Sequence, residues 1–178
     1  MIIALAGRRI DSSDANEARF PLRNVERVRS RVRVLFQENA AAALVSSAAC
    51  GADLIALSEA GKLGLRRRVV LPFARARFRE SSVIDRPGDW AVLYDQILDV
   101  VDKAGDLVVL QHMKDDLAYS AANRAILDEA ANLAEQVAEA VLAVRVWEGV
   151  SRGAHDLTEE FGVEACKRGL LVQEIQTT

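Results

Sequence analysis

Each of five short apolar runs in the sequence is followed by polar residues whose types suit a phosphorylated ligand. In chain order these sets are Gly7, Arg8, Arg9 and Asp11; Ser46, Ser47, Gly51 and Asp53; Arg75, Arg77 and Phe78; His112, Tyr119, Asn123 and Arg124; and Glu148, Gly149, Gly153, His155, Asp156, Thr158, Glu159 and Glu160. Arginine donates two parallel hydrogen bonds to one phosphate, an aromatic ring can stack on a base, and a carboxylate can accept from ribose hydroxyls. The combined set predicts a nucleotide-like ligand better than a fatty acid, a metal cluster or a peptide.

The apolar runs are predicted to be strands, because helical patterns alternate with them. Residues 43–73 have the order strand, turn, helix, turn, strand, which is a βαβ unit and predicts a parallel sheet. In such a sheet ligands bind at the carboxyl ends of the strands, where helix N-termini present backbone N–H groups. The predicted strands are 2–6, 44–45, 69–71, 107–110, 141–147 and 170–175, and the predicted helices are 21–39, 54–63, 90–103 with Asp89 as cap, 119–135 and 157–168. We therefore expect one α/β domain over residues 1–178, doubly wound and Rossmann-like, with a mainly parallel sheet.

Composition excludes several classes of function. The chain has 178 residues, 51% of them apolar, and a net charge of −3, which gives no general reason to expect nucleic acid or an acidic membrane as partner. Its two cysteines, Cys50 and Cys166, lack the spacing of a disulfide framework or a zinc site, which favours a reducing cytosol. No apolar run approaches the roughly 20 residues needed to span a bilayer, and the first apolar run is too short for a signal peptide. We expect a cytoplasmic protein without a cofactor or a metal.

Several of these residues also have a purely structural interpretation. Asp53 either caps the following helix or contacts the ligand, and Phe78 either packs in the core or stacks on a base. The arginines at 75, 77 and 79 are either solvated or bind phosphate. Glu159 and Glu160 lie in the first turn of a helix, where carboxylates are favourable without any function.

For three other residues neither a metal role nor a catalytic role is expected. His112 and His155 have no ligand spacing to acidic or sulfur-containing residues, so a metal role is not expected for either. Cys50 is expected to be a small buried hydrophobe. No P-loop, GxGxxG or serine-triad pattern is present in the sequence.

Five segments, in this order, resemble the SLOG superfamily of Rossmann-like domains. They are SAACGADLIALSEAGKLGL, VVLPFARARFRESSV, the predicted helix 90–104, AYSAANRAILDEA and VWEG…LTEEF…CKRG. This superfamily includes the LOG-type phosphoribohydrolases (often labelled lysine decarboxylases), DNA-processing protein A, and nucleotide-sensor modules of cyclase, TIR and anti-phage effector proteins. The resemblance covers nearly the whole chain and is closest to the sensor-like branch.

The resemblance implies a pocket for a nucleotide or a nucleotide-derived signal across the strand ends. Phosphates would contact Arg8, Arg9, Arg75 and Arg124. Ribose or base edges would contact Asp11, Asp53 and Asn123, and Tyr119 or Phe78 would stack. The remaining expected contacts are Gly7, Ser47, Gly51, Gly149, Gly153 and Thr158.

The chain departs from LOG-type enzymes at one turn. Those enzymes carry PGGxGTxxE, whose backbone holds the phosphate and whose glutamate serves catalysis. Here Thr158 matches the threonine, but Asp156 and Leu157 precede it and Phe161 stands where the glutamate would be, with Glu160 one residue early. One residue is about 100° on a helix, so Glu160 should point away, and Asp156 should bring a carboxylate where phosphate would bind.

The leading hypothesis is therefore a sensor or regulatory module that binds a nucleotide-derived molecule without turnover. It would act on a separate effector protein, and the resemblance allows a homodimer. The first alternative is a nucleoside-phosphate N-glycosidase or nucleoside transferase with Glu160 or Asp156 as its catalytic carboxylate. The second is an interaction subunit whose pocket is vestigial.

Overall fold

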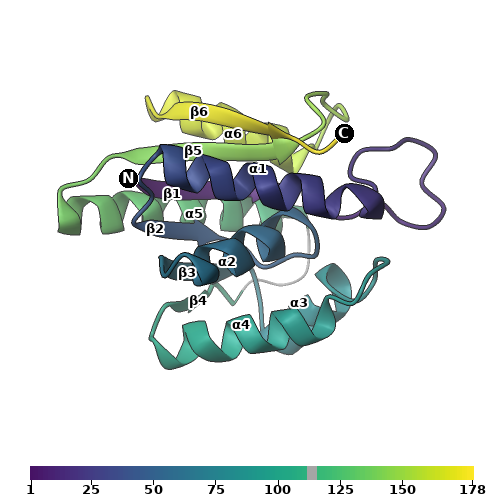
Figure 1. Ribbon diagram of the computed structural model, residues 1–178, viewed down its shortest axis with the longest axis horizontal. Coiled ribbons are helices and arrows are strands. Elements are labelled where there is room, and N and C mark those ends of the chain that lie inside the picture. The colour runs from purple at the N-terminus through teal and green to yellow at the C-terminus, as the bar shows by residue number, and fades with distance from the viewer. Residues whose placement is uncertain (112–115) are drawn as a thin grey trace.

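A twisted parallel sheet forms the centre of the protein, as the computed structural model of residues 1–111 and 116–178 shows (Figure 1). It has six strands in the order β4-β3-β2-β1-β5-β6, and all neighbouring pairs are parallel. This confirms the predicted α/β class and the Rossmann-like arrangement. The strands are β1 (Ile2–Gly7), β2 (Ala43–Ser46), β3 (Arg66–Leu71), β4 (Leu107–Val109), β5 (Val141–Trp147) and β6 (Leu171–Gln176).

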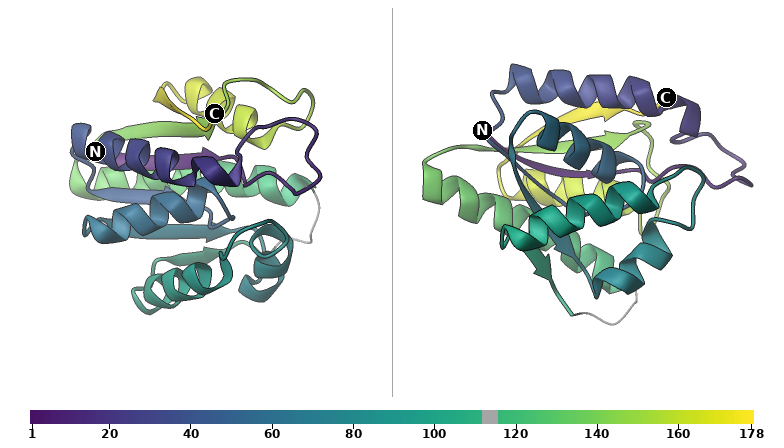
Figure 2. Two further views of the ribbon diagram at one scale, coloured as in Figure 1. Left: turned by 45° about the vertical axis from the view of Figure 1, so that its right-hand side comes forward. Right: turned by 60° about the horizontal axis from the view of Figure 1, so that its bottom comes forward.

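Helices cover both faces of the sheet (Figures 1 and 2). One face packs against α1, α2 and α4, and the other against α5 and α6. The helices are η1 (Leu22–Asn24), α1 (Val25–Glu38), α2 (Ala52–Lys62), α3 (Arg75–Ser82), α4 (Ala91–Lys103), α5 (Asp116–Val137) and α6 (Leu157–Lys167).

Successive side chains along β1 point to opposite faces of the sheet, so β1 contributes to both hydrophobic core clusters. Ile3 and Leu5 belong to the cluster that contains α1, α2 and α4, whereas Ile2 and Ala4 belong to the cluster that contains α5 and α6. All four side chains are almost completely buried. A strand buried on both faces reads as a continuous apolar run, which is why 2–6 could be recognised from the sequence.

Three local predictions are corrected by the structure. The run at 107–110 is not a buried strand, because β4 lies at the sheet edge and Val109 is 37% exposed. The N-cap of α4 is Trp90 and not Asp89, and the Trp90 indole N–H donates to the Pro87 carbonyl at 2.8 Å. No helix was expected at α3, whose arginine-rich sequence has little helical periodicity. It is held by contacts to α4 that only the tertiary structure provides, such as the salt bridge between Arg79 and Asp95.

The strand order places a topological switch point between β1 and β5. From β1 the chain winds outward through β2, β3 and β4, and it then returns through α5 to add β5 on the other side of β1. The loops after β1 and β5 therefore diverge at their carboxyl ends and leave a crevice. This is where ligands bind in open α/β sheets.

Candidate functional site

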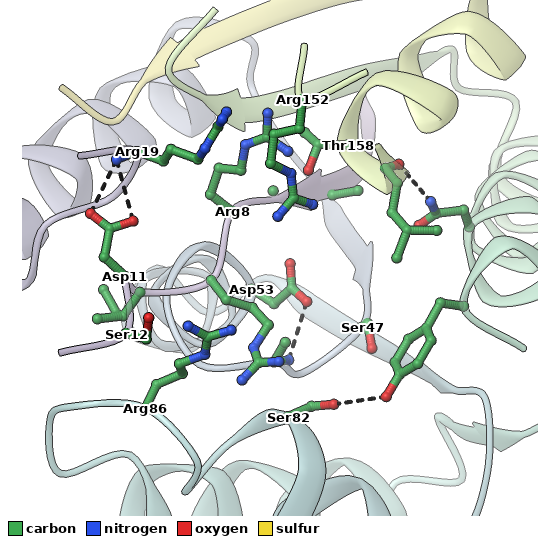
Figure 3. A pocket seen from close by; sticks show the side chains of 18 of the residues that line it. Arg8, Asp11, Ser12, Arg19, Ser47, Asp53, Ser82, Arg86, Arg152 and Thr158 are labelled. Atoms are coloured by element: carbon green, nitrogen blue, oxygen red, sulfur yellow. Dashed lines mark hydrogen bonds between the residues drawn. The ribbon is translucent and has the colours of Figure 1, made fainter. Parts of the chain in front are cut away.

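A cavity of about 680 Å³ opens at this switch point (Figure 3). Its wall combines the loop after β1, the loop between β2 and α2, the end of α3, the first part of α5 and the N-terminus of α6. A volume of this size lies within the range of small-molecule sites. Loops far apart in sequence meet here because parallel strands bring their carboxyl ends to the same edge of the sheet.

Two glycines allow the loops beneath the cavity to pack closely. A Cβ on Gly7 would lie 2.5 Å from the Ala52 Cβ and 2.7 Å from the Val146 carbonyl oxygen. Gly51 has a φ of +99°, and a Cβ there would lie 2.8 Å from the Arg8 carbonyl oxygen. The start of α2 can thus approach β1 only because neither residue has a side chain. Gly51 supports the wall, although it does not line the cavity itself.

Ten of the predicted binding residues line this cavity among the described residues, and they come from five separate segments. They are Gly7, Arg8, Arg9, Asp11, Ser47, Asp53, Phe78, Tyr119, Asn123 and Thr158.

The remaining predicted residues do not line it. They are Gly51, Arg75, Arg124, Gly149, Gly153, Asp156 and Glu160. His155 is exposed outside the cavity, and His112 lies outside the described residues.

Arg8 lies almost buried, 3% exposed, in an ion-pair network beside the cavity. Its guanidinium donates to both Asp156 oxygens at 2.6 and 2.8 Å and to both Glu148 oxygens at 2.6 and 3.0 Å. It also donates to the Val150 carbonyl at 3.0 Å. The guanidinium that was expected to bind phosphate is thus engaged with protein acceptors.

Asp156 occupies the N-terminus of α6. Its carboxylate accepts from the backbone N–H groups of Thr158 and Glu159, at 3.0 and 3.2 Å, and from that of Arg152 at 2.8 Å. Burial by itself would raise the pKa of Asp156, but the hydrogen bonds from Arg8 and the backbone outweigh it and hold that pKa well below its usual range. A protein carboxylate therefore takes the place that a phosphate takes at a glycine-rich helix N-terminus.

Glu160 faces a different part of the surface. Its carboxylate accepts from the Ser120 hydroxyl at 2.9 Å, in a depression of about 270 Å³ between α5 and α6. Arg124 lines the same depression and is exposed. Neither residue reaches the main cavity, which agrees with the expected rotation of Glu160 away from it.

Arg75 joins α3 to α4 instead of reaching the cavity. It pairs with Asp99 at 2.7 Å and donates to the Asp95 carbonyl at 3.1 Å. Gly149 and Gly153 have φ values of +87° and +88° and lie exposed in the loop before α6. These glycines shape the turn that carries Arg152 and Asp156.

Asp11 organises the segment that covers one side of the cavity. Its carboxylate accepts from the backbone N–H groups of Arg19 and Phe20, at 3.1 and 2.9 Å. This closes a loop over residues 11–20 and brings the Arg19 side chain to the cavity, where it pairs with Glu148 at 2.5 Å. This largely exposed segment therefore supplies a wall of the cavity.

Asp53 is the buried acid of the cavity. It is 6% exposed, and one carboxyl oxygen, Oδ2, accepts from the Ala49 N–H at 3.1 Å (Figure 3). The other oxygen, Oδ1, is buried and has no hydrogen-bond partner within the described part of the chain. Burial raises the pKa of Asp53 to about 7, although the Ala49 N–H and the charge of Arg9 oppose the rise. Asp53 does not act as the N-cap of α2, because Gly51 holds that position.

The opposite wall of the cavity is formed by α5 and α3. The Tyr119 hydroxyl lies 3.3 Å from the Ser82 hydroxyl, and the Asn123 amide donates to the Leu157 carbonyl at 2.8 Å. Phe78 is only 1% exposed and packs against Phe73 and Tyr94 with ring centroids 5.9 and 6.4 Å apart. This arrangement favours the packing role of Phe78 and leaves Tyr119 as the more accessible ring.

The cavity also contains three arginines that sequence reasoning missed. Arg19, Arg86 and Arg152 line it together with Arg8 and Arg9. Arg86 and Arg152 have the weakest pairing, each 3.7 Å from its nearest acidic partner, Asp85 or Asp156 respectively. Arg152 follows the fifth predicted strand, so its position alone could have pointed to it, whereas nothing local distinguishes Arg19 or Arg86.

The part of the chain that the structure describes contains neither a candidate metal site nor a candidate membrane-spanning helix. Residues 1–111 and 116–178 contain no group of three or more histidine, cysteine or acidic side chains placed to hold a metal ion. Among the same residues no helix is long and apolar enough to cross a membrane.

Fold and site together define a doubly wound α/β domain with an arginine-rich cavity at its switch point. No model of a known protein family matches the chain. No curated protein sequence matches it either. Among solved structures, DNA processing protein A (DprA) from Streptococcus pneumoniae is similar to 97% of this chain, with 13% sequence identity and a TM-score of 0.42. The chain spans 57% of the length of that structure.

Proposed function

We propose that this protein binds a nucleotide or a nucleotide-derived signalling molecule in the cavity at the switch point, as a sensor or regulatory module. The observation that carries the proposal is the composition of the cavity wall. Arginines, a buried carboxyl group with one oxygen unpaired among the described residues, an amide and a tyrosine converge there from segments distant in the sequence. A cavity with a few convergent polar groups is the expected form of a small-molecule site.

Phosphate binding is assigned to Arg86 and Arg152, with Arg9 beside them. The guanidinium groups of Arg8, Arg9 and Arg19 each have a close carboxylate partner, whereas Arg86 and Arg152 have only 3.7 Å contacts. A phosphate that reached Arg86 or Arg152 would displace little existing pairing. The same pairing limits the surplus positive charge, so the cavity suits a ligand with few phosphates better than a polyphosphate.

The base or ribose end of the ligand is assigned to the α5 side of the cavity. Tyr119 can stack on a base, Asn123 offers an amide oxygen, and Ser47 and Ser82 offer hydroxyls. These groups are polar and mostly neutral, unlike the arginine side. The ligand would therefore lie with its phosphate toward the loops after β1 and β5.

Binding without turnover is favoured over glycosidic cleavage by the positions of the two proposed catalytic carboxylates. Asp156 is held by Arg8 and by the N-terminus of α6, and Glu160 lies in a separate depression. Neither carboxylate faces the cavity where a ligand would lie. A signal would then pass to a separate effector protein, which this chain would bind in a ligand-dependent manner.

A thermal-shift screen with product analysis tests this function. The probes are mononucleotides, cyclic di- and trinucleotides, ADP-ribose and cyclic ADP-ribose. A ligand at about 100 times its dissociation constant should stabilise the fold by about 2.7 kcal/mol. A shift with the ligand recovered intact supports the sensor, and release of free base would instead establish an N-glycosidase. Absence of any shift would favour an interaction subunit with a vestigial pocket.

A further inference from the structure

The Asp53 carboxyl group has an arrangement that the packing of the protein does not explain. One oxygen accepts a hydrogen bond from the Ala49 N–H, as in a structural residue, but Oδ1 is buried and has no hydrogen-bond partner among residues 1–111 and 116–178. A buried polar atom without a hydrogen bond costs free energy, so such atoms are rare and call for an explanation. Asp53 lines the cavity, and its carboxyl group lies between Arg152 and Arg86 in the view of Figure 3.

We propose that the protonated form of Asp53 binds the ligand, with its Oδ1 hydroxyl donating a hydrogen bond to an acceptor atom of the ligand. This inference rests on the proposed function and adds a requirement to it. The ligand must present an acceptor, such as a ring nitrogen or a carbonyl oxygen, to the start of α2. Because only protonated Asp53 can donate this hydrogen bond, the affinity for the ligand should also depend on pH.

Within residues 1–111 and 116–178 no cation forms a salt bridge with Asp53, which favours the neutral form of its carboxyl group. Arg9 is the charged group that acts on it directly, but the Arg9 guanidinium is bound to Asp85 and lacks a salt bridge to Asp53. Burial is the largest influence on its pKa, which rises to about 7. A buried carboxyl group without a cationic partner keeps its proton, and it then acts as a hydrogen-bond donor.

The charged and titratable groups around Asp53 come from the elements packed against the start of α2. These are Arg8 and Arg9 after β1, Cys50 in the turn before α2, Asp85 and Arg86 after α3, and Arg152 before α6. Burial raises the pKa of the Cys50 thiol, so it stays neutral near pH 7. Asp85 pairs with both Arg9 and Arg86, and arginine does not titrate in this range. Asp53 is thus the group among these that is expected to change its charge between pH 6 and 8.5.

Asparagine at position 53 is a permanent mimic of the protonated acid. Its amide oxygen can accept from the Ala49 N–H while its NH₂ group occupies the place of the Oδ1 hydroxyl and still donates. Leucine has the same branching at Cγ, although it is larger, and it cannot donate a hydrogen bond. The pair Asp53→Asn and Asp53→Leu therefore separates hydrogen-bond donation from the shape of the side chain.

The first measurement is the titration of Asp53 itself in the ligand-free full chain. In protein labelled with ¹³C at aspartate carboxyl groups, the resonance missing from Asp53→Asn assigns Asp53. A titration midpoint near 7 is expected. A midpoint below about 5 would show an ionised carboxylate at neutral pH and would overturn the inference without touching the proposed function.

The second measurement is calorimetric affinity at pH 6 and pH 8.5, with AMP and ADP-ribose as probes. If only the protonated form binds, the wild-type dissociation constant should be about 30 times larger at pH 8.5 than at pH 6. Asp53→Asn should show less than a threefold change, and this variant also controls for ionisation of the probe's own phosphate. Asp53→Leu should bind at least tenfold more weakly than Asp53→Asn at pH 6.

The outcomes separate the two proposals. Binding of AMP or ADP-ribose with the same pH dependence in wild type and Asp53→Asn overturns the proton-linked contact and leaves the nucleotide site intact. Absence of binding by either probe at both pH values overturns the inference for these ligands. The wider screen described above then decides the proposed function separately.

Discussion

The Asp156 carboxylate receives two hydrogen bonds from the Arg8 guanidinium, at 2.6 and 2.8 Å, and both side chains are almost completely buried. The pair connects the end of β1 to the N-terminus of α6 across the switch point. Since Asp156 also caps α6 and Arg8 also binds Glu148, the network fixes the loops on both sides of the cavity.

Asp156→Ala should be strongly destabilising. The change removes the N-cap of α6 and leaves the buried Arg8 charge with one carboxylate partner fewer, so we expect a loss of about 3–5 kcal/mol in the free energy of unfolding. Urea denaturation followed by circular dichroism measures it. Glu160→Ala, in the same turn of α6, is the matched control and should cost less than about 1 kcal/mol. Equal effects of the two changes would contradict the role given to the pair.

Low pH should reduce the free energy of unfolding, because it protonates the two carboxylates that bind Arg8. The pKa values of Asp156 and Glu148 are lowered in the folded protein, because the hydrogen bonds and charge of their arginine partners outweigh the effect of burial. A lowered folded-state pKa contributes stability that is present above the unfolded-state value and is lost as pH falls below it. Stability should therefore decline as pH falls below about 4.5. The decline should be shallower in Asp156→Asn, and parallel curves for the two proteins would contradict this prediction.

Arg86→Ala and Arg152→Ala should each weaken nucleotide binding about tenfold or more, because these are the cavity cations with the weakest internal pairing. Arg75→Ala is the control, since Arg75 joins α3 to α4 outside the cavity. Calorimetry with the best probe of the thermal-shift screen measures the affinity. If Arg75→Ala reduced affinity as much as the other two changes, the phosphate would not lie where we place it.

Glu160→Gln should leave ligand affinity unchanged within about threefold, because Glu160 bonds Ser120 in a depression apart from the cavity. Any turnover found by product analysis should also persist in this variant. Loss of turnover with retained affinity would instead identify Glu160 as a catalytic carboxylate and would favour the N-glycosidase alternative.

Asp53→Asn should change how stability depends on pH. The folded-state pKa of Asp53 is raised to about 7 from 3.8, so its contribution to stability is fully present below about pH 4 and is lost as pH rises through 7. Relative to wild type, Asp53→Asn should gain about 4 kcal/mol as pH rises from 4 to 8. Urea denaturation of both proteins at these two pH values checks the difference, and a constant difference would mean that folding does not raise the pKa of Asp53.

The sequence by itself was enough to predict the fold class and the edge of the sheet where the cavity lies. Strands such as 2–6 and 69–71 are continuous apolar runs because they are buried on both faces, and a regular alternation with helices implies a parallel sheet. In a parallel sheet every strand ends at the same edge, so residues after each strand must meet there. That is why the sequence alone predicts Arg8, Asp53, Tyr119 and Thr158 in one site, and all four line the cavity.

Tertiary structure decided which of these residues face the cavity and which charges are already neutralised. Arg8 and Arg152 have the same chemistry in the sequence, but only packing shows that Arg8 is engaged with Glu148 and Asp156 while Arg152 is largely free. Arg19 comes from a segment without periodicity, and it reaches the cavity because Asp11 closes that segment through backbone N–H groups. Local sequence carries residue type and periodicity, whereas pairing and burial depend on groups that are distant in the chain. The burial of Asp53 Oδ1 without a hydrogen-bond partner in the described part of the chain is therefore a property that only the folded protein reveals.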